Sequence, residues 1–179
     1  MKYEAIDYVP KPDILEELSI PVVYVHKSLI ERLTESRVEK IFHKGLIVDK
    51  DDFLTEEALP ELVKGTVLDQ VFRFITYMGM NNHLDFKMSY GLRMGLLKLF
   101  EYNREDFFAL SKDKNYFLPG AKEFIDYFNG IPKVMLSGGV LEDALQSAAY
   151  LGIEMVIAND AGFDNEGRLK KTPHAYVNG

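Results

Sequence analysis

Residues 45–52 read Gly-Leu-Ile-Val-Asp-Lys-Asp-Asp, an apolar run that ends in three carboxylates within four positions. Such a short, branched, glycine-bounded run is typical of a buried strand. Strand alternation points Asp49 and Asp51 the same way, and two like charges so close are costly unless a cation or a shared proton relieves them. The stretch therefore indicates a metal and phosphoryl site at these two residues. The alternative is a solvated acidic turn, because Asp favours turns.

The second half of the chain alternates strands and helices. We expect a helix from about 120 to 129, a strand over 134–136, a helix over 141–151, a strand over 154–158 and a turn over 164–167. Strands and helices alternating at this spacing predict an α/β fold, a Rossmann-like parallel sheet with helices on both faces. Functional groups in such sheets gather at the carboxyl ends of the strands.

A long helical stretch separates the first of these strands from the rest. Residues 55–110 carry apolar side chains mostly at helical spacing, and the stretch is too long for an ordinary crossover helix. We therefore predict a helical cap of residues 55–110, inserted after the first core strand. The core then comprises residues 45–54 and 111–179. Residues 1–44 form an N-terminal segment of unknown role, in which we expect a strand at 20–25 and a helix at 28–42.

The second candidate motif is Ser137-Gly138-Gly139, which follows the expected strand at 134–136. Ser137 offers a hydroxyl donor, and the glycines let backbone N–H groups approach an anion closely. In a parallel sheet this motif and the acidic motif at 49–51 open onto the same edge. Carboxylates for a metal and donors for a phosphate thus converge, although Ser-Gly-Gly alone is also a common strand-to-helix turn.

Composition narrows the class of protein. The 179 residues have 47% hydrophobic content and a net charge of −7, so one core with an accessory element is expected, and nucleic acid or an anionic membrane is not an expected partner. The absence of cysteine excludes disulfides, thiolate catalysis and cysteine-based zinc sites. No leader-like or membrane-spanning apolar run is evident in the sequence, so a cytoplasmic location is the default expectation.

The order of these motifs resembles the haloacid dehalogenase (HAD) superfamily, and within it the phosphoserine phosphatases. The resemblance covers roughly residues 45–178 and rests on the run ending at Asp49-Lys50-Asp51, a helical insert, and the later motifs Leu118-Pro119-Gly120-Ala121, Ser137-Gly138-Gly139, Ala158-Asn159 and Asp164-Asn165-Glu166-Gly167-Arg168-Leu169. It implies an Mg²⁺-dependent phosphomonoester hydrolase acting on a small phosphorylated metabolite, with phosphoserine as one candidate.

The resemblance also implies roles for individual residues. Asp49 would be the nucleophile that forms an aspartyl phosphate, and Asp51 the general acid and base. Both would hold Mg²⁺, Asp51 through its carbonyl oxygen. Ser137 and the Gly138 N–H would bind the phosphoryl oxygens. Arg93 matches a cap arginine that pairs with the substrate carboxylate, and Glu57 lies one place from the family's cap glutamate.

The chain departs from the family pattern in several places. Phe53 occupies a position where the family has Thr or Val, and Asp52 one where it has a small residue. A catalytic lysine and a later strand ending in an acidic Gly-Asp pattern are not recognisable. The sequence is therefore either a piece of a longer phosphatase or a relative that binds without turnover. Phosphotransfer to an alcohol other than water stays open, as does assembly into a homodimer.

Overall fold

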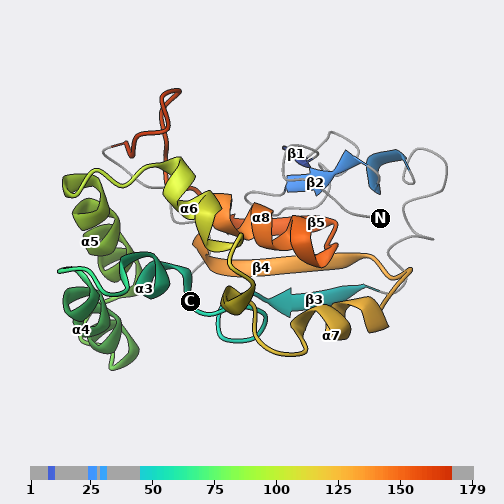
Figure 1. Ribbon diagram of the computed structural model, residues 1–179, viewed down its shortest axis with the longest axis horizontal. Helices are drawn as coiled ribbons and strands as arrows, with labels where there is room; N and C mark the ends of the chain where they lie inside the picture. The colour runs from blue at the N-terminus through green and yellow to red at the C-terminus, as the bar shows by residue number, and fades with distance from the viewer. Residues whose placement is uncertain (1–7, 11–23, 28, 32–44, 171–179) are drawn as a thin grey trace.

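The computed structural model describes residues 8–10, 24–27, 29–31 and 45–170, and their strands form one sheet (Figure 1). The order across the sheet is β1-β2-β5-β4-β3. The strands are β1 (Tyr8–Pro10), β2 (Tyr24–His26), β3 (Leu46–Asp49), β4 (Lys133–Val140) and β5 (Met155–Asn159). Strands β3, β4 and β5 are parallel, whereas β1 and β2 join antiparallel next to β5. The predicted α/β class and Rossmann-like parallel core are confirmed.

The N-terminal segment contributes to this sheet. The strand expected at 20–25 overlaps β2 at Tyr24 and Val25, which pair with β5. Residues 20–23 lie outside the described residues. Most of the helix expected at 28–42 lies outside the described residues. The N-terminal segment thus extends the sheet on the side away from β3.

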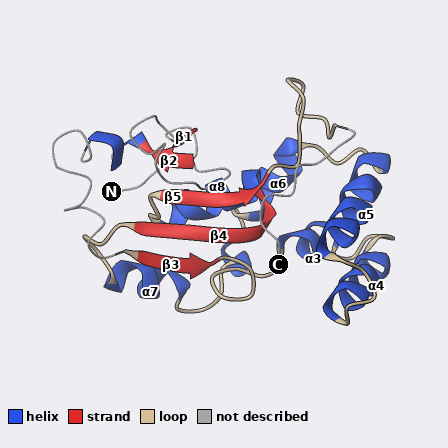
Figure 2. Ribbon diagram, turned by 180° about the vertical axis from the view of Figure 1, so that it is seen from behind, coloured by secondary structure: helices blue, strands red, loops and turns tan. Residues whose placement is uncertain are grey.

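Helices α7 (Ala121–Tyr127) and α8 (Leu141–Leu151) pack on the same face of the sheet. Figure 2 shows the strands in front of both helices. Their side chains share one apolar core with the strands, which includes Ile125, Ala144, Val48, Met135 and Val156. The prediction placed helices on both faces. Two successive right-handed crossovers that step the same way, from β3 to β4 to β5, bring their helices to one side.

Strand β4 is longer than the sequence pattern predicts. The apolar pattern ended the strand at Leu136, but β4 continues through Ser137, Gly138 and Gly139 to Val140. The pairing with β5 shifts register between Leu136 and Val140, which is a bulge-like irregularity. The Ser-Gly-Gly motif therefore lies in the irregular end of a strand rather than in a turn after it.

The stretch between β3 and β4 is helical, as expected. It contains α3 (Ala58–Val63), α4 (Asp69–Met80), α5 (Phe86–Leu99), α6 (Arg104–Leu110) and the 3₁₀ turn η3 (Lys114–Tyr116). In Figure 1, the arrow of β3 points toward the group formed by α3, α4 and α5. These helices share a second apolar cluster that includes Phe72, Tyr90, Phe107, Val140 and Phe163. The helical insert is thus joined to the carboxyl end of the sheet, and its division into a separate cap stays a prediction.

None of the described helices is both long enough and apolar enough to cross a membrane.

Candidate functional site

Asp49 ends β3 at the carboxyl edge of the sheet, with an exposed side chain. Its Oδ1 accepts a 2.7 Å hydrogen bond from the Lys50 backbone N–H. After Lys50 the chain turns sharply, because the N–H groups of Leu54 and Thr55 both donate to the Lys50 carbonyl oxygen, at 2.9 and 3.0 Å. Asp52 takes a left-handed conformation with φ 60°, which aspartate tolerates better than most residues. This turn directs Asp51 toward the neighbouring strand.

Asp51 and Ser137 are in direct contact across β3 and β4. The Ser137 hydroxyl donates to Asp51 Oδ2 at 2.8 Å and accepts from the Gly139 N–H at 3.0 Å. Ser137 is 1% exposed. The Gly138 carbonyl oxygen accepts a 2.7 Å hydrogen bond from Asn159 Nδ2 at the end of β5. The expected meeting of the two motifs is therefore found, while the roles assigned to these residues remain predictions.

Lys50 contributes a buried cation to the site. The sequence analysis did not predict a role for this lysine. Its side chain is fully buried. Its Nζ lies 2.8 Å from Asp51 Oδ1 and 2.6 Å from Asp143 Oδ2. It also donates to the Tyr116 hydroxyl at 2.8 Å and to Thr55 Oγ1 at 3.2 Å. The Tyr116 hydroxyl in turn donates to Asp143 Oδ2 at 2.7 Å. One ammonium group thus connects the tip of β3 to helix α8 and the turn η3.

The electrostatics of this cluster keep Lys50 charged. Burial disfavours the ammonium ion, but the opposing effects of Asp143, Tyr116 and Asp51 hold the pKa of Lys50 well above its ordinary value. One signal in the sequence could have located it. Lys50 lies two residues after the buried Val48, so alternation points it to the same face, toward α8.

Arg93 and Glu57, the two predicted substrate residues, pair with each other. Arg93 Nη1 lies 2.7 Å from Glu57 Oε1, and the Arg93 Nε–H donates to the Ser89 carbonyl oxygen at 3.4 Å. Arg93 is 6% exposed. Burial raises the pKa of Glu57, and the Arg93 charge opposes this shift. The pair joins helix α5 to the residue before α3.

The oxygen donors at the tip of β3 fit part of a magnesium site. Carboxylate and carbonyl oxygens are the ligands that Mg²⁺ prefers, and it commonly uses only one or two protein carboxylates with water and substrate phosphate. Asp49 offers an exposed carboxylate, and both Asp51 carboxylate oxygens already contact Lys50 or Ser137. Within the part of the chain that the structure describes, no group of three or more His, Asp or Glu side chains is placed to hold a metal ion.

Two of the hollows among the described residues lie near these side chains, and one of the two adjoins the motif at 49–51. That hollow, of about 440 Å³, is lined by Asp49, Asp51 and Asp52, and by Phe53 and Phe124. The Phe53 ring packs edge-to-face against Phe124, with centroids 5.4 Å apart. The bulky residue at position 53 is therefore held against helix α7.

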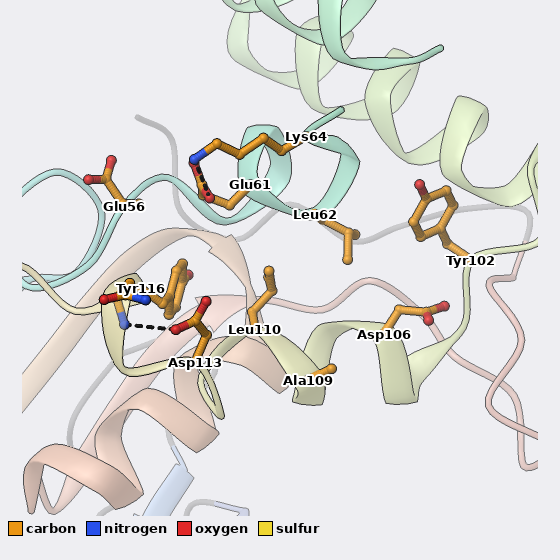
Figure 3. Close-up of a pocket in the computed structure, with 11 residues that line it drawn as sticks. Glu56, Glu61, Leu62, Lys64, Tyr102, Asp106, Ala109, Leu110, Asp113 and Tyr116 are labelled. Carbon is orange, nitrogen blue, oxygen red and sulfur yellow. Dashed lines mark hydrogen bonds and ion pairs between the residues drawn. The ribbon is translucent and has the colours of Figure 1, made fainter. Parts of the chain in front are cut away.

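The other hollow, of about 570 Å³, lies between α3, α6 and η3 (Figure 3). Four carboxylates line it, from Glu56, Glu61, Asp106 and Asp113, and Lys64 in its lining pairs with Glu61 at 2.9 Å. Lys64 offsets only one of these four charges, so a phosphate group would be repelled there. The lining of the hollow beside Asp49 is also acidic, so an anionic ligand at either place would need a cation.

Comparison with solved structures identifies the fold. A phosphoserine phosphohydrolase-like protein from Francisella tularensis is 21% identical with a TM-score of 0.59, covering 71% of this chain and 63% of its own. A phosphoserine phosphatase in a phospho-aspartyl intermediate analogue form is 24% identical with a TM-score of 0.60, covering 74% and 63%. A HAD family hydrolase from Salmonella enterica is 21% identical with a TM-score of 0.59, covering 72% and 45%.

This chain has the HAD fold. The resemblance seen in the sequence is thus confirmed at the level of structure. The chain spans 63% of the length of the first two of these structures. No protein-family model and no curated protein matches the sequence. The HAD fold places the ends of β3 and β4, with Asp49, Asp51 and Ser137, at the edge where α/β proteins bind ligands.

Proposed function

We propose that the protein containing this chain is a phosphomonoester hydrolase that acts through an aspartyl phosphate on Asp49. One observation carries the proposal. Asp51 and Ser137 are held 2.8 Å apart at the carboxyl ends of two parallel strands, in the fold of phosphoserine phosphatases. Asp49 ends the same strand, exposed and beside Leu136, its partner in the register of β4.

The proposed reaction has two displacements. An oxygen of the Asp49 carboxylate attacks phosphorus, and the bond from phosphorus to the leaving oxygen breaks. Asp51 supplies the proton that the departing alcohol takes up. Asp51 then accepts a proton from the water that attacks the aspartyl phosphate, which releases phosphate and restores Asp49. Splitting the hydrolysis in this way replaces one difficult step by two easier ones.

Ser137 and the backbone at Gly138 would bind the transferring phosphoryl group. In this structure the Ser137 hydroxyl donates to Asp51. Substrate binding would redirect this donor to a phosphoryl oxygen, while the Gly139 N–H would still donate to Ser137 Oγ. Asp49 and the Asp51 carbonyl would hold Mg²⁺, which when bound neutralises charge on the phosphoryl oxygens. Charge stabilisation of this kind supplies most of the catalysis in phosphoryl transfer.

The substrate we propose is a small phosphorylated metabolite, with phosphoserine as the leading candidate. The buried Arg93 guanidinium supports this choice, because a planar fork of donors suits a carboxylate. Glu57 now occupies Arg93 at 2.7 Å, so the substrate carboxylate would compete with Glu57 for the guanidinium. The ammonium group of the same substrate would form an ion pair with the Glu57 carboxylate.

A protein that binds phosphorylated ligands without turnover is the competing proposal. Its support is that both carboxylate oxygens of Asp51 already contact Lys50 or Ser137. Phosphotransfer to an alcohol uses the same aspartyl phosphate and is distinguished by its products.

Turnover by the full-length natural protein tests the proposal. Hydrolysis of p-nitrophenyl phosphate is measured with and without Mg²⁺, for the wild type and for Asp49→Asn. We expect Mg²⁺-dependent release of phosphate that falls by at least ~10³-fold in the variant, as for loss of a nucleophile. Asp126→Asn is the matched control, since Asp126 is an exposed aspartate on α7 that does not line the hollow beside Asp49. Phosphoserine binding without turnover in every variant would favour the competing proposal.

A further inference from the structure

The side chain of Lys50 holds one oxygen of Asp51 while Ser137 holds the other. Lys50 Nζ is 2.8 Å from Oδ1, and Ser137 Oγ is 2.8 Å from Oδ2. The Asp51 side chain is 20% exposed, so it lies at the boundary between core and solvent. With a contact on each oxygen, the carboxylate plane has a defined orientation at the carboxyl edge of the sheet.

The ammonium group is itself firmly anchored. Its other contacts come from three separate segments, namely Asp143 in the first turn of α8, Tyr116 in η3 and Thr55 in the turn after β3. The Lys50 and Asp143 side chains are fully buried, and Tyr116 is 4% exposed. A lysine normally keeps its charge in water on a flexible stem. Here it is fixed from behind, so it can act as a rigid support for Asp51.

A purely structural explanation of this lysine is weak on energetic grounds. Removing a lysine and an aspartate from water is energetically costly, and well-packed apolar residues often serve stability as well as a buried ion pair. Asp143 alone could also satisfy the charge. The additional contact with Asp51 carries the ammonium group to the one partly exposed carboxylate of the cluster, which is a proposed site residue.

We propose that Lys50 is the positioning residue for Asp51, fixing Oδ1 so that Oδ2 faces the oxygen of the leaving alcohol. The inference rests on the proposed function, in which Asp51 gives a proton to that oxygen. It assigns no chemistry to Lys50 itself. A misplaced acid slows mainly those substrates whose leaving group needs a proton. Loss of Lys50 should therefore affect such substrates more than others, whereas a general loss of stability would affect all substrates equally.

Leaving-group dependence gives the kinetic test in the full-length protein. An alkyl phosphate such as phosphoserine requires protonation of its leaving oxygen, whereas the p-nitrophenolate ion leaves without it. We expect Lys50→Met to lower kcat/KM for phosphoserine at least ~10-fold more than kcat/KM for p-nitrophenyl phosphate, with the same trend as Asp51→Asn. The comparison uses kcat/KM because the later hydrolysis of the aspartyl phosphate is common to both substrates. Equal losses on both substrates would overturn the proposal.

Lys133→Met is the matched control. Lys133 is another buried lysine, 3.9 Å from Glu154 Oε1, at the opposite end of β4. Its loss should affect both substrates equally. If Lys50→Met does not fold, Tyr116→Phe replaces it, because this change removes one hydrogen bond from the ammonium group and keeps the ring. The same bias toward phosphoserine, in a smaller amount, is expected, and an unbiased loss would contradict the role.

A second measurement separates this inference from the proposed function. Buried lysine ammonium groups exchange slowly enough to be followed by ¹H–¹⁵N NMR of the ¹⁵N-labelled protein. Asp51→Asn should shift the Lys50 ammonium signal and leave that of Lys133 unchanged. An unmoved Lys50 signal would overturn the contact even in an active enzyme. A shifted signal in a protein without turnover would instead sink the phosphatase proposal and retain the contact.

Discussion

Ser137 and Asp51, which are 86 positions apart in the chain, share a 2.8 Å hydrogen bond from hydroxyl to carboxylate across the ends of β4 and β3. The contact joins the two motifs that the sequence had singled out separately. It also makes the geometry of each dependent on the other, because a shift of either strand end changes the orientation of both side chains.

Gly139→Ala should reduce activity by roughly 10-fold or more, because the new methyl group would crowd the site. A Cβ at this position would lie 3.1 Å from Ser137 Oγ and 3.2 Å from Asp51 Oδ2, closer than ordinary contact. Misplaced reacting groups lose rate steeply with small displacements. Steady-state kinetics on p-nitrophenyl phosphate provide the measurement.

The control for that change is Gly95→Ala in helix α5. Gly95 is exposed, and a Cβ there has no neighbour within 4 Å. Alanine should stabilise the helix by about 0.5–1 kcal/mol and leave kcat unchanged. A Gly139→Ala variant as active as this control would contradict the crowding at Asp51.

Ser137→Ala should lower kcat/KM by roughly 10²-fold, since it removes a donor proposed to bind the phosphoryl group. It should also cost about 1 kcal/mol of unfolding free energy, because the Gly139 N–H loses its acceptor. Ser147→Ala on α8 is the comparison. Ser147 Oγ is buried without a partner among the described residues, so its removal should be neutral or stabilising. Urea titrations and kinetics of both variants decide between a local and a general effect.

Arg93→Met should discriminate between substrates. We expect kcat/KM for phosphoserine to fall about 10²-fold more than for p-nitrophenyl phosphate, which has no carboxylate for the guanidinium to bind. Arg73→Met serves as the control. Arg73 lies on the exposed side of α4, and within the described part of the chain its salt bridge is with Asp69. Parallel losses on the two substrates would remove Arg93 from the substrate site and leave it as the partner of Glu57.

Glu142 should make stability fall as the pH rises from about 4.5 to about 7. Burial, with a smaller effect of Asp160, raises the pKa of Glu142 from 4.5 to about 7, while Arg104 opposes the shift. Burial, and to a lesser extent the charge of Glu142, raises the pKa of the Tyr90 hydroxyl. Between these pH values the folded state binds more protons than the unfolded chain, so the free energy of unfolding decreases, by at most roughly 3 kcal/mol.

Urea unfolding of Glu142→Gln at pH 5 and pH 8 provides the check. The variant should be the more stable protein at pH 8 and should show a flatter pH dependence than the wild type. Glu123→Gln, on the exposed side of α7, should keep the wild-type slope. An unchanged slope in Glu142→Gln would assign the pH dependence to other groups.

The parallel core and the meeting of Asp51 with Ser137 could be predicted because both follow from local patterns. Short apolar runs mark the strands, and in a parallel sheet their carboxyl ends share an edge. The full length of β4 could not be predicted from the sequence, because glycine weakens a strand pattern and the register shift depends on pairing with β5. The placement of α7 and α8 on one face depends on the order of the strands in the sheet and on the direction of the crossovers, which apolar periodicity does not encode.

The cluster around Lys50 was missed for a different reason. A lysine between aspartates normally indicates a solvated turn, and Asp143 in the first turn of a helix is explained by the helix dipole. The partners Lys50, Tyr116 and Asp143 lie far apart in sequence, and no local pattern links them. Only the fold brings them within hydrogen-bonding distance.

Strand β3 has one described neighbour, so its backbone has two unlike sides. The Leu46 and Lys50 N–H groups donate toward β4, at 2.9 Å each, and alternation places Val48 with them. The N–H groups of Ile47 and Asp49 point away from β4. Amide hydrogen exchange should therefore be slow at Val48 and Lys50 and faster at Ile47 and Asp49. Slowing at those two amides alone, on adding any partner, would report a strand pairing along the edge of β3 that faces away from β4.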